Sequence, residues 1–431
     1  MIAWLLISFF VLLFLGVPIA MSLGLSAMGG ILFLGGGSTV TIAQRMFEGM
    51  NSFALLAIPL YTFAGFTMSK GGISKRLMDF CYSIVGHIYG GLAHVNVLSS
   101  MIFAGISGSA VADTAGVSGM FMPEMIRKGY SKNFTVAVTA ISSTIGIIIP
   151  PSIPMVVIAG ICGISTGKLF LGGIIPGILC GLAQMIVSYF LAKKEGVPKE
   201  PGHFTIGPVL HGLWESWPAL LMPIIIVGTI TMGIVSPTEA GVIAVVYGLF
   251  AGGIIYRELK WEDIKFAFAE TVRTSGRIFI VIGAAKLYTV MLTTAGFDKW
   301  VAKTMLGFST NPTVILIMIL LIFFIVTMFM ESIATLTLFM PILYPIALGV
   351  GINPIVLSVL ITVVIGIGLV TPPVGMCIYV ACDLMDTTVG EVFPTLVPFI
   401  AATFVCIALP SADPAAHLFD GVTVASAFQI W

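Results

Sequence analysis

Two groups of residues in the first half of the chain could together bind a small cation. Residues 107–114 combine hydroxyl groups, small residues and the carboxylate of Asp113 between two apolar arms of about ten residues each, long enough to cross half a membrane. A later apolar run ends in Pro150 and Pro151. Proline lacks a backbone donor and disfavours helical angles in the preceding residue, so residues 146–151 should be unwound, with free carbonyl oxygens. A re-entrant hairpin that faces this break would form an oxygen-rich site.

The same features recur in the second half, where the run 368–373 ends in Pro372 and Pro373. Three pairs of residues match in their spacing. They are Asp113 and Glu331, each ten residues before the proline of a Phe-Met-Pro sequence; Gly129 and Gly351, each 17 residues before Gly146 or Gly368; and Pro176 and Pro398, each 25 residues after the second adjacent proline. Matching over this length indicates an internal duplication with a small insertion.

The two copies differ in the charge of one loop. Arg127, Lys128 and Lys132 follow the first hairpin, whereas residues 344–354 of the second copy carry no charge. Because basic loops stay in the cytoplasm, the copies are predicted to have opposite orientations in a membrane. Inverted repeats build many secondary transporters, whose binding sites lie near the middle of the bilayer. The pattern therefore predicts transport, with one cation site in each repeat.

The elements that position these residues are expected to be membrane helices. Of the 431 residues, 58% are hydrophobic and 9% charged, and the mean hydropathy is +1.12. About 20 apolar residues suffice to cross a hydrocarbon core. The expected stretches are 2–34, 51–69, 79–103, 134–164, 169–192, 215–234, 237–256, 278–296, 312–330, 354–382 and 391–409. The fold class is therefore an all-α polytopic membrane protein, and its first segment is expected to be retained rather than cleaved.

Polar segments divide the chain. Four basic clusters are assigned to the cytoplasm: Lys70 with Lys75 and Arg76; Arg127 with Lys128 and Lys132; Lys193 with Lys194 and Lys199; and the amphipathic stretch 257–277. The expected parts are scaffold helices at 1–97; a first repeat core at 98–192, with a hairpin at 98–125 and a broken helix at 134–164; a cytoplasmic connector at 193–214; further scaffold at 215–311; a second repeat core at 312–409, with a hairpin at 320–345 and a broken helix at 354–382; and an atypical polar tail at 410–431.

Composition excludes several classes of function. The hydropathy excludes a water-soluble enzyme, and 19 basic against 19 acidic residues leave no net positive charge for binding nucleic acid. The six cysteines form no Cys-X-X-Cys pair, so neither a disulfide framework nor a transition-metal site is expected. The sequence contains no phosphate-binding loop of the P-loop type, so no nucleotide is expected to drive transport.

Six motifs are spread over most of the chain. They are Ser107-Gly-Ser-Ala-Val-Ala-Asp113, Gly129-Tyr-Ser with Phe134, Ile149-Pro-Pro-Ser152, Met340-Pro-Ile-Leu343, Gly351-Ile-Asn-Pro354 and Thr371-Pro-Pro-Val-Gly375. Together they resemble the large membrane subunit of tripartite ATP-independent periplasmic (TRAP) transporters, over about residues 1–409. The resemblance implies a sodium-coupled importer of a small organic acid, such as sialic acid or a C4-dicarboxylate, in a bacterial inner membrane. It also implies an elevator-type movement, with sodium ions for coupling and no other cofactor.

The resemblance further implies two protein partners, a small membrane subunit of four helices and a periplasmic substrate-binding protein, with membrane lipid around the chain. Because the sequence starts directly with its own first helix, the small subunit is expected to be a separate polypeptide.

The same resemblance implies the site residues. Sodium site 1 would comprise Ser107, Ser109, Gly146, Ile149, Pro150 and Pro151; sodium site 2 would comprise Glu331, Gly368, Thr371 and Val374, mostly through carbonyl oxygens; substrate contacts are expected from Asp113, Ser152, Thr335 and Lys286. Glu331 stands where the resemblance leads us to expect aspartate. Lys286 lies in an apolar run, where a cation costs about 2.5–3.5 kcal/mol. It should therefore pair with Glu331 or a substrate carboxylate, or extend to a membrane interface.

Two other functions fit parts of the sequence. An ion or proton antiporter could use a related inverted-repeat scaffold. An intramembrane serine protease is suggested by Gly105-Ile-Ser107-Gly108 and by Gly163-Ile-Ser-Thr-Gly167. Such an enzyme would need a histidine base on a later membrane helix, but His203, His211 and His417 all lie outside apolar runs. Sodium-driven import that depends on a binding protein would distinguish the leading hypothesis from the antiporter.

Overall fold

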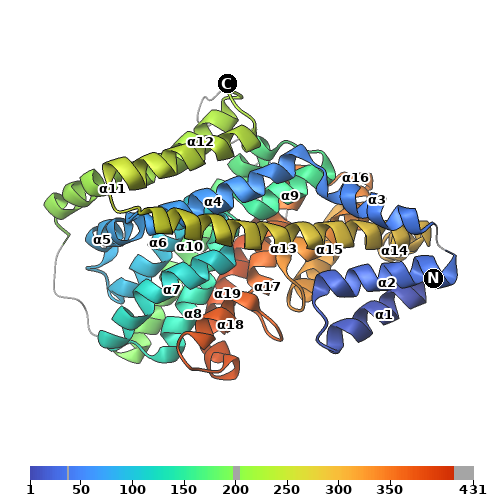
Figure 1. Ribbon diagram of the computed structural model, residues 1–431. Coiled ribbons are helices and arrows are strands. Elements are labelled where there is room, and N and C mark those ends of the chain that lie inside the picture. Colours follow the sequence, from blue (N-terminus) through green and yellow to red (C-terminus); the bar gives the residue numbers. More distant parts are fainter. Residues whose placement is uncertain (36–37, 198–203, 412–431) are drawn as a thin grey trace.

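The computed structural model describes residues 1–35, 38–197 and 204–411, and within these ranges the chain forms helices and connecting loops but no strand (Figure 1). Seven helices of this part are long and apolar enough to cross a membrane, and six shorter apolar helices accompany them. A helix satisfies its own backbone donors and acceptors, which hydrocarbon cannot do. The predicted all-α polytopic membrane fold is confirmed.

The first half of the chain, up to residue 197, forms α-helices with two short 3₁₀ segments, η1 and η2. Their bounds are α1 Ile2–Phe14, α2 Ile19–Leu34, α3 Thr39–Met50, η1 Phe53–Leu56, α4 Ala57–Lys70, α5 Ile73–Val85, α6 Gly91–Ser107, α7 Ala110–Arg127, α8 Lys132–Ser143, η2 Thr144–Ile147, α9 Ile153–Cys162 and α10 Thr166–Glu195.

The second half begins at residue 204 and includes one π-helical segment, η3. Its bounds are α11 Ile206–Thr231, α12 Pro237–Phe250, η3 Ala251–Ile255, α13 Trp261–Thr294, α14 Phe297–Phe308, α15 Pro312–Thr327, α16 Ser332–Gly349, α17 Pro354–Gly368, α18 Met376–Asp383 and α19 Val389–Ser411. Residues 198–203 of the predicted connector and 412–431 of the predicted tail lie outside the described residues.

Several helices differ from the predicted segments. The stretch 2–34 forms two helices, because Gly16 has a positive φ and Pro18 precedes α2. The stretch 79–103 likewise divides into α5 and α6, and Gly90 at the start of α6 has φ +76°. The amphipathic stretch and the apolar run after it form one continuous helix of 34 residues, α13. The hairpin arms are also longer than ten residues, since α6 has 17 and α7 has 18.

Helix bounds in the two halves repeat at a constant spacing of 222 residues. Helices α7 and α16 start at residues 110 and 332 and end at 127 and 349, and the adjacent prolines begin at 150 and 372. Two residues after each helix end lies a glycine of positive φ, Gly129 after α7 and Gly351 after α16. In each case the next N–H donates to a carbonyl five residues earlier, as in a Schellman motif. This spacing pairs Glu331 with Ser109 and needs no insertion, so the predicted pairing of Asp113 with Glu331 is wrong by one helical turn.

The two repeats exchange helices. Helix α9 of the first repeat packs on α16 of the second, and α18 of the second packs on α7 of the first. Helices α8 and α19 also pack together, and Phe134 stacks on Phe399 with ring centroids 6.4 Å apart. Helix α13 runs across the molecule and contacts α2, α3, α4 and α16 (Figure 1). Both helix breaks therefore belong to one packed unit.

Candidate functional site

The turn between α6 and α7 presents Ser107, Gly108 and Ser109. Gly108 adopts the left-handed conformation, with φ +65°, which reverses the chain without a Cβ penalty. Ser109 caps α7 by accepting a hydrogen bond from Ala112 N. The Ser107 hydroxyl donates to Asp113 Oδ1 and accepts from Ser109 N at 3.2 Å. The turn is thereby tied to the first turn of α7.

The first helix break faces this turn directly. Pro150 and Pro151 are joined by a cis peptide bond, and Ser152 caps α9 by accepting from Met155 N at 3.3 Å. The Ser152 hydroxyl donates to Ile147 O at 2.5 Å, and Ile153 N donates to Gly108 O at 3.2 Å. A Cβ at Gly108 would lie 2.6 Å from Pro151 O. The hairpin turn and the break are therefore in backbone contact.

Asp113 is the acidic side chain at this junction. It is 4% exposed, and its Oδ2 atom has no hydrogen-bond partner. This oxygen occupies the space that a Cβ at Gly146 would fill, and the same Cβ would lie 3.6 Å from the carbonyl carbon of Ser109. None of the ion pairs among the described residues includes Asp113. A buried carboxylate is costly unless a cation or donors compensate it, so the site suits a bound cation.

The second helix break, residues 369–375, follows α17. Pro372 and Pro373 are joined by a cis peptide bond, and Cys377 N donates to Leu369 O at 2.9 Å across the break. Val374 N donates to Met328 O at 2.9 Å, which connects the break to the turn between α15 and α16. The Thr371 hydroxyl donates to Ile367 O at 2.7 Å. This break therefore also contacts its hairpin turn through backbone atoms.

Glu331 plays a different part from Asp113. It is the N-cap of α16, and its carboxylate accepts from Ile333 N at 3.2 Å, from Ala334 N at 3.4 Å and from the Ser332 hydroxyl at 3.0 Å. Thr335 stands at the position that corresponds to Asp113, and its hydroxyl donates to Glu331 O. The carboxylate of the second repeat therefore has donors that Asp113 Oδ2 lacks.

The two breaks also differ in exposure. Pro150, Pro151 and Ser152 are buried, whereas Pro373 and Val374 are exposed, Val374 by 42%. Gly368 packs against Thr327, since a Cβ there would lie 2.7 Å from the Thr327 Cβ. The second site is therefore not a copy of the first.

Most predicted site residues lie around these two junctions, but Lys286 does not. Ser107, Ser109, Gly146, Pro151, Asp113 and Ser152 gather at the first; Glu331, Thr335, Thr371 and Val374 gather at the second. Ile149 directs its side chain toward Gly177 of α10, and Pro150 O lies 3.7 Å from the Cβ position of Gly105. Lys286 on α13 packs against Gly49 of α3. The hydrogen bond from Arg45 lowers the pKa of the neighbouring Glu48, and the positive charge of Lys286 lowers it further.

A buried polar cluster beside the first junction was not predicted from the sequence. The Asn96 amide donates to Thr139 Oγ1 at 2.7 Å, and the Ser142 hydroxyl donates to Asn96 Oδ1 at 3.1 Å. Ser100 donates to Ser142 at 3.0 Å. Asn96 and Ser100 are four residues apart on α6, which is the available sequence signal for a polar helix face. These bonds join α6 to α8 and so support the hairpin.

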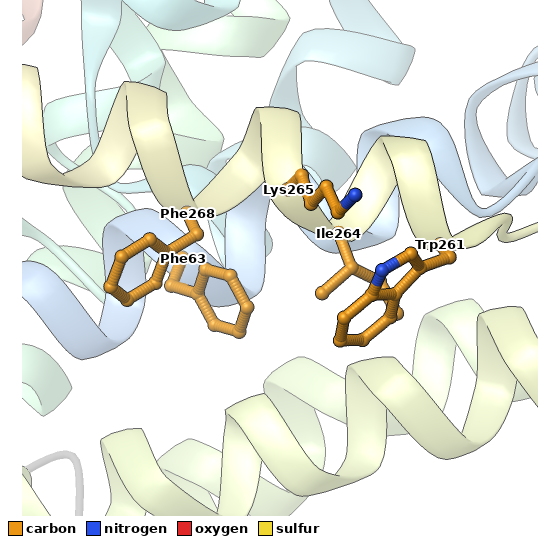
Figure 2. A pocket seen from close by; sticks show the side chains of 5 residues that line it. All are labelled: Phe63, Trp261, Ile264, Lys265 and Phe268. Carbon is orange, nitrogen blue, oxygen red and sulfur yellow. The ribbon is translucent and has the colours of Figure 1, made fainter.

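Two further features involve residues of neither break. A cavity of about 330 Å³ is lined by Phe63 of α4 and by Trp261, Ile264, Lys265 and Phe268 of α13 (Figure 2).

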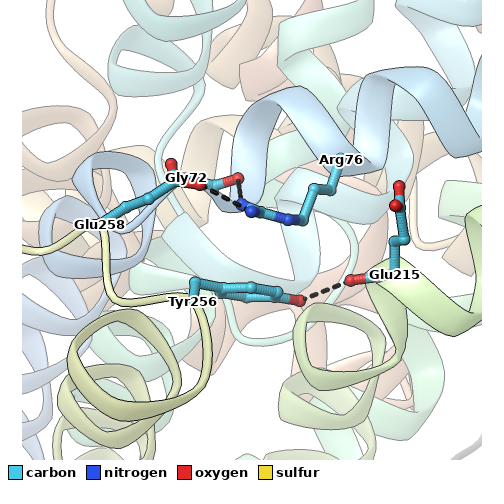
Figure 3. A network of polar contacts seen from close by, with 5 residues as sticks. All are labelled: Gly72, Arg76, Glu215, Tyr256 and Glu258. Atoms are coloured by element: carbon cyan, nitrogen blue, oxygen red, sulfur yellow. Dashed lines mark hydrogen bonds and ion pairs between the residues drawn. The ribbon is translucent and has the colours of Figure 1, made fainter.

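A polar cluster fastens α5 to the connection between α12 and α13 (Figure 3). Arg76 donates to Glu258 at 2.6 Å and to Gly72 O at 2.8 Å, and its guanidinium lies 4.3 Å from the Tyr256 ring centroid. The Tyr256 hydroxyl donates to Glu215 O at 3.0 Å.

The sequence was compared with families of known proteins and with individual relatives. The sequence model of the DctM component of tripartite ATP-independent periplasmic transporters matches residues 6–416. The large permease protein SiaM of a sialic acid TRAP transporter of Vibrio cholerae is 34% identical, over 94% of each chain. The large permease protein DctM of a C4-dicarboxylate TRAP transporter of Pseudomonas aeruginosa is 35% identical, over 92% of this chain and 93% of the relative.

One relative is longer than this chain. The isethionate TRAP transporter permease protein DctMQ of Oleidesulfovibrio alaskensis is 36% identical over 95% of this chain, which spans 65% of that relative. Among solved structures, the YdaH transporter of Alcanivorax borkumensis has a TM-score of 0.59 at 13% identity and covers 90% of this chain and 88% of its own. This likeness concerns the fold.

The family consists of transporter permeases, so the alternative of an intramembrane protease is set aside. The family model matches most of the chain, and the apolar helices and the paired helix breaks agree with that match. The chain belongs to the DctM family, the large permease components of tripartite ATP-independent periplasmic transporters, and is a multi-pass protein of the bacterial inner membrane.

Proposed function

We propose that this chain is the large permease subunit of a sodium-coupled TRAP transporter that imports a small organic acid delivered by a periplasmic binding protein. The observation that carries the proposal is Asp113, a buried carboxylate with one unpartnered oxygen beside the first helix break. A carboxylate and backbone carbonyls are oxygen ligands of the kind that hard cations prefer.

At the first site, the cation would lie between the hairpin turn and the break. The carboxylate of Asp113, the hydroxyls of Ser107 and Ser109, and backbone oxygens from Gly146 and from residues 149–151 are the candidate ligands. The contact between Ile153 N and Gly108 O holds the two backbone segments in position. A monovalent ion here would compensate the charge of Asp113.

At the second site, the candidate ligands are Glu331, Thr371 and the carbonyls of Gly368 and Val374. Backbone donors already stabilise Glu331, so the charge of this carboxylate is partly compensated without an ion. We therefore propose that the second site binds sodium more weakly than the first. Two ions entering down a potential of about 100 mV would supply about 2.3 kcal/mol each, and each tenfold sodium gradient about 1.4 kcal/mol more per ion.

The proposed substrate is a small organic anion. The similar permeases have names that specify sialic acid, C4-dicarboxylates and isethionate. Ser152 caps α9 and Thr335 lies in the first turn of α16, so both hydroxyls stand at helix N-termini, which favour anions. We propose them as substrate contacts, with Asp113 acting through the bound cation. Lys286 packs against Gly49 of α3 and is not among the proposed substrate contacts.

The proposed movement is of the elevator type. Helix α9 of the first repeat packs on α16 of the second, and α18 of the second packs on α7 of the first, so both breaks would move together as one rigid body. The scaffold would include α11, α12 and the long helix α13. A small membrane subunit is the proposed partner in the membrane. We propose that it is a separate polypeptide, although one relative, named DctMQ, is a longer permease.

The test is reconstitution of this chain with its small subunit and binding protein in liposomes. Candidate labelled acids, sialic acid and succinate among them, are added outside with an inward sodium gradient. The proposal expects uptake that needs both sodium and the binding protein, and that Asp113→Asn reduces. Export of sodium or protons coupled to entry of the other ion, without any organic acid, would establish the antiporter instead.

A further inference from the structure

The cavity between α4 and α13 combines an apolar lining with one cationic group. Phe63, Ile264 and Phe268 supply apolar surface, and Trp261 and Phe268 are 68% and 63% exposed (Figure 2). The charged lining residue is Lys265, whose Nζ lies 5.9 Å from the Trp261 ring centroid. The volume of the cavity, about 330 Å³, is at the lower end of the range for ligand sites.

The charge of Lys265 is not compensated by an acid. None of the ion pairs in the described ranges includes Lys265. The neighbouring Asp263 accepts a hydrogen bond from Lys260 N at 3.0 Å, and no carboxylate lines the cavity. The cavity is therefore positive at one point and apolar elsewhere.

The contacts between α4 and α13 indicate which side of the membrane the cavity lies near. Phe63 meets Phe268 edge to face with centroids 6.4 Å apart, and Lys70 Nζ lies 4.8 Å from the Phe266 centroid. Lys70 ends α4 and Trp261 begins α13, so the charged ends of these two helices lie together. This end carries basic residues that the sequence assigns to the cytoplasmic side, and tryptophan is enriched at such interfaces.

We propose that this cavity binds an anionic phospholipid of the cytoplasmic leaflet. The phosphate contacts Lys265 Nζ beside the Trp261 ring, and one acyl chain lies along Ile264, Phe63 and Phe268. A helix of the small subunit fits less well, because a helix is about 10–12 Å wide and a stable interface buries about 800 Å² on each partner. An anionic amphiphile matches both the single cation and the apolar walls.

Native mass spectrometry of the purified full chain tests this proposal. Phosphatidylglycerol and phosphatidylcholine with identical acyl chains are titrated separately, and the first bound lipid is quantified. The wild type is expected to prefer phosphatidylglycerol about fivefold, which is the effect of about one basic residue near a headgroup. Lys265→Gln should remove this preference while both lipids still bind. Lys260→Gln is the matched control, because it removes an equal charge from the same helix end but does not line the cavity.

A second variant tests the apolar part. Ile264→Trp fills the cavity and should weaken the binding of both lipids several-fold, which a headgroup effect alone would not do. The proposal is overturned if Lys265→Gln keeps the preference, or if Lys260→Gln loses it equally. It is also overturned if the variant Ile264→Cys cross-links to the small subunit in membranes, since a protein then occupies the cavity. If Ile264→Trp does not fold, the comparison of Lys265→Gln with Lys260→Gln decides alone.

Discussion

Oδ2 of Asp113 lies in the space where any residue other than glycine at position 146 would place its Cβ. Gly146 thus leaves room beside a buried carboxylate, at the point where η2 leads into the first helix break. The absence of a side chain at position 146 thus makes room for the buried carboxylate oxygen itself. We regard this pair of residues as the centre of the proposed first cation site.

Gly146→Ala should therefore strongly reduce sodium-coupled uptake. The added Cβ would collide with Asp113 and displace it from the break, and we expect uptake to fall about tenfold or more, equivalent to about 1.4 kcal/mol. Uptake is measured in proteoliposomes as a function of sodium concentration. Gly119→Ala is the matched control, because a Cβ at Gly119 of α7 meets no atom within 4 Å. Equal uptake by both variants would remove Gly146 from the site.

Glu331→Gln separates the charge of this residue from its role as a helix cap. Glutamine keeps an acceptor for Ile333 N and Ala334 N, so the free energy of unfolding should change by less than about 1 kcal/mol. The sodium concentration for half-maximal uptake should rise about tenfold, because the negative charge is lost. Glu331→Ala should show the same sodium effect and a lower thermal unfolding temperature. A sodium requirement that stays the same in Glu331→Gln would leave only the capping role.

Lys286→Met tests whether this lysine contacts substrate. Because Lys286 packs on Gly49 and lies near Glu48 of α3, we expect uptake to stay within about twofold of wild type. The initial uptake rate at saturating sodium is the measurement, with the exposed Lys303→Met on α14 as the control. Loss of uptake in Lys286→Met alone would instead make it a substrate contact.

Arg76→Ala should destabilise the connection between α5 and the α12–α13 loop. The variant loses the ion pair with Glu258 and the contact with the Tyr256 ring, together about 1–2 kcal/mol for a side chain that is 27% exposed. Thermal unfolding in detergent measures the change. Arg273→Ala, which breaks an exposed pair within α13, should cost no more than about 0.5 kcal/mol. If Arg76→Ala loses no more stability than Arg273→Ala, the polar cluster around Arg76 contributes little to the stability of the protein.

The sequence predicted the helix breaks well because proline acts locally: each pair of adjacent prolines lies in a nonhelical segment. It predicted too few helices at 2–34 and 79–103, because hydropathy does not register a reversal of chain direction within an apolar run.

The pairing of Asp113 with Glu331 was wrong for a different reason. Helix α16 contains Pro341 and Pro345, one turn apart, and only the helix ends determine which of them matches Pro123. The surroundings of Lys286 were not predictable, since the neighbouring helix α3 was not expected.

The exchange of α9 and α18 between the repeats has a consequence for the separated halves of the chain. A fragment that stops before residue 198 would leave the face of α9 that packs on α16 uncovered, and its counterpart would lack α7 beneath α18. Neither fragment alone would bury its apolar surfaces. When the two fragments are expressed together, they should assemble, because each covers the apolar surface that the other leaves exposed.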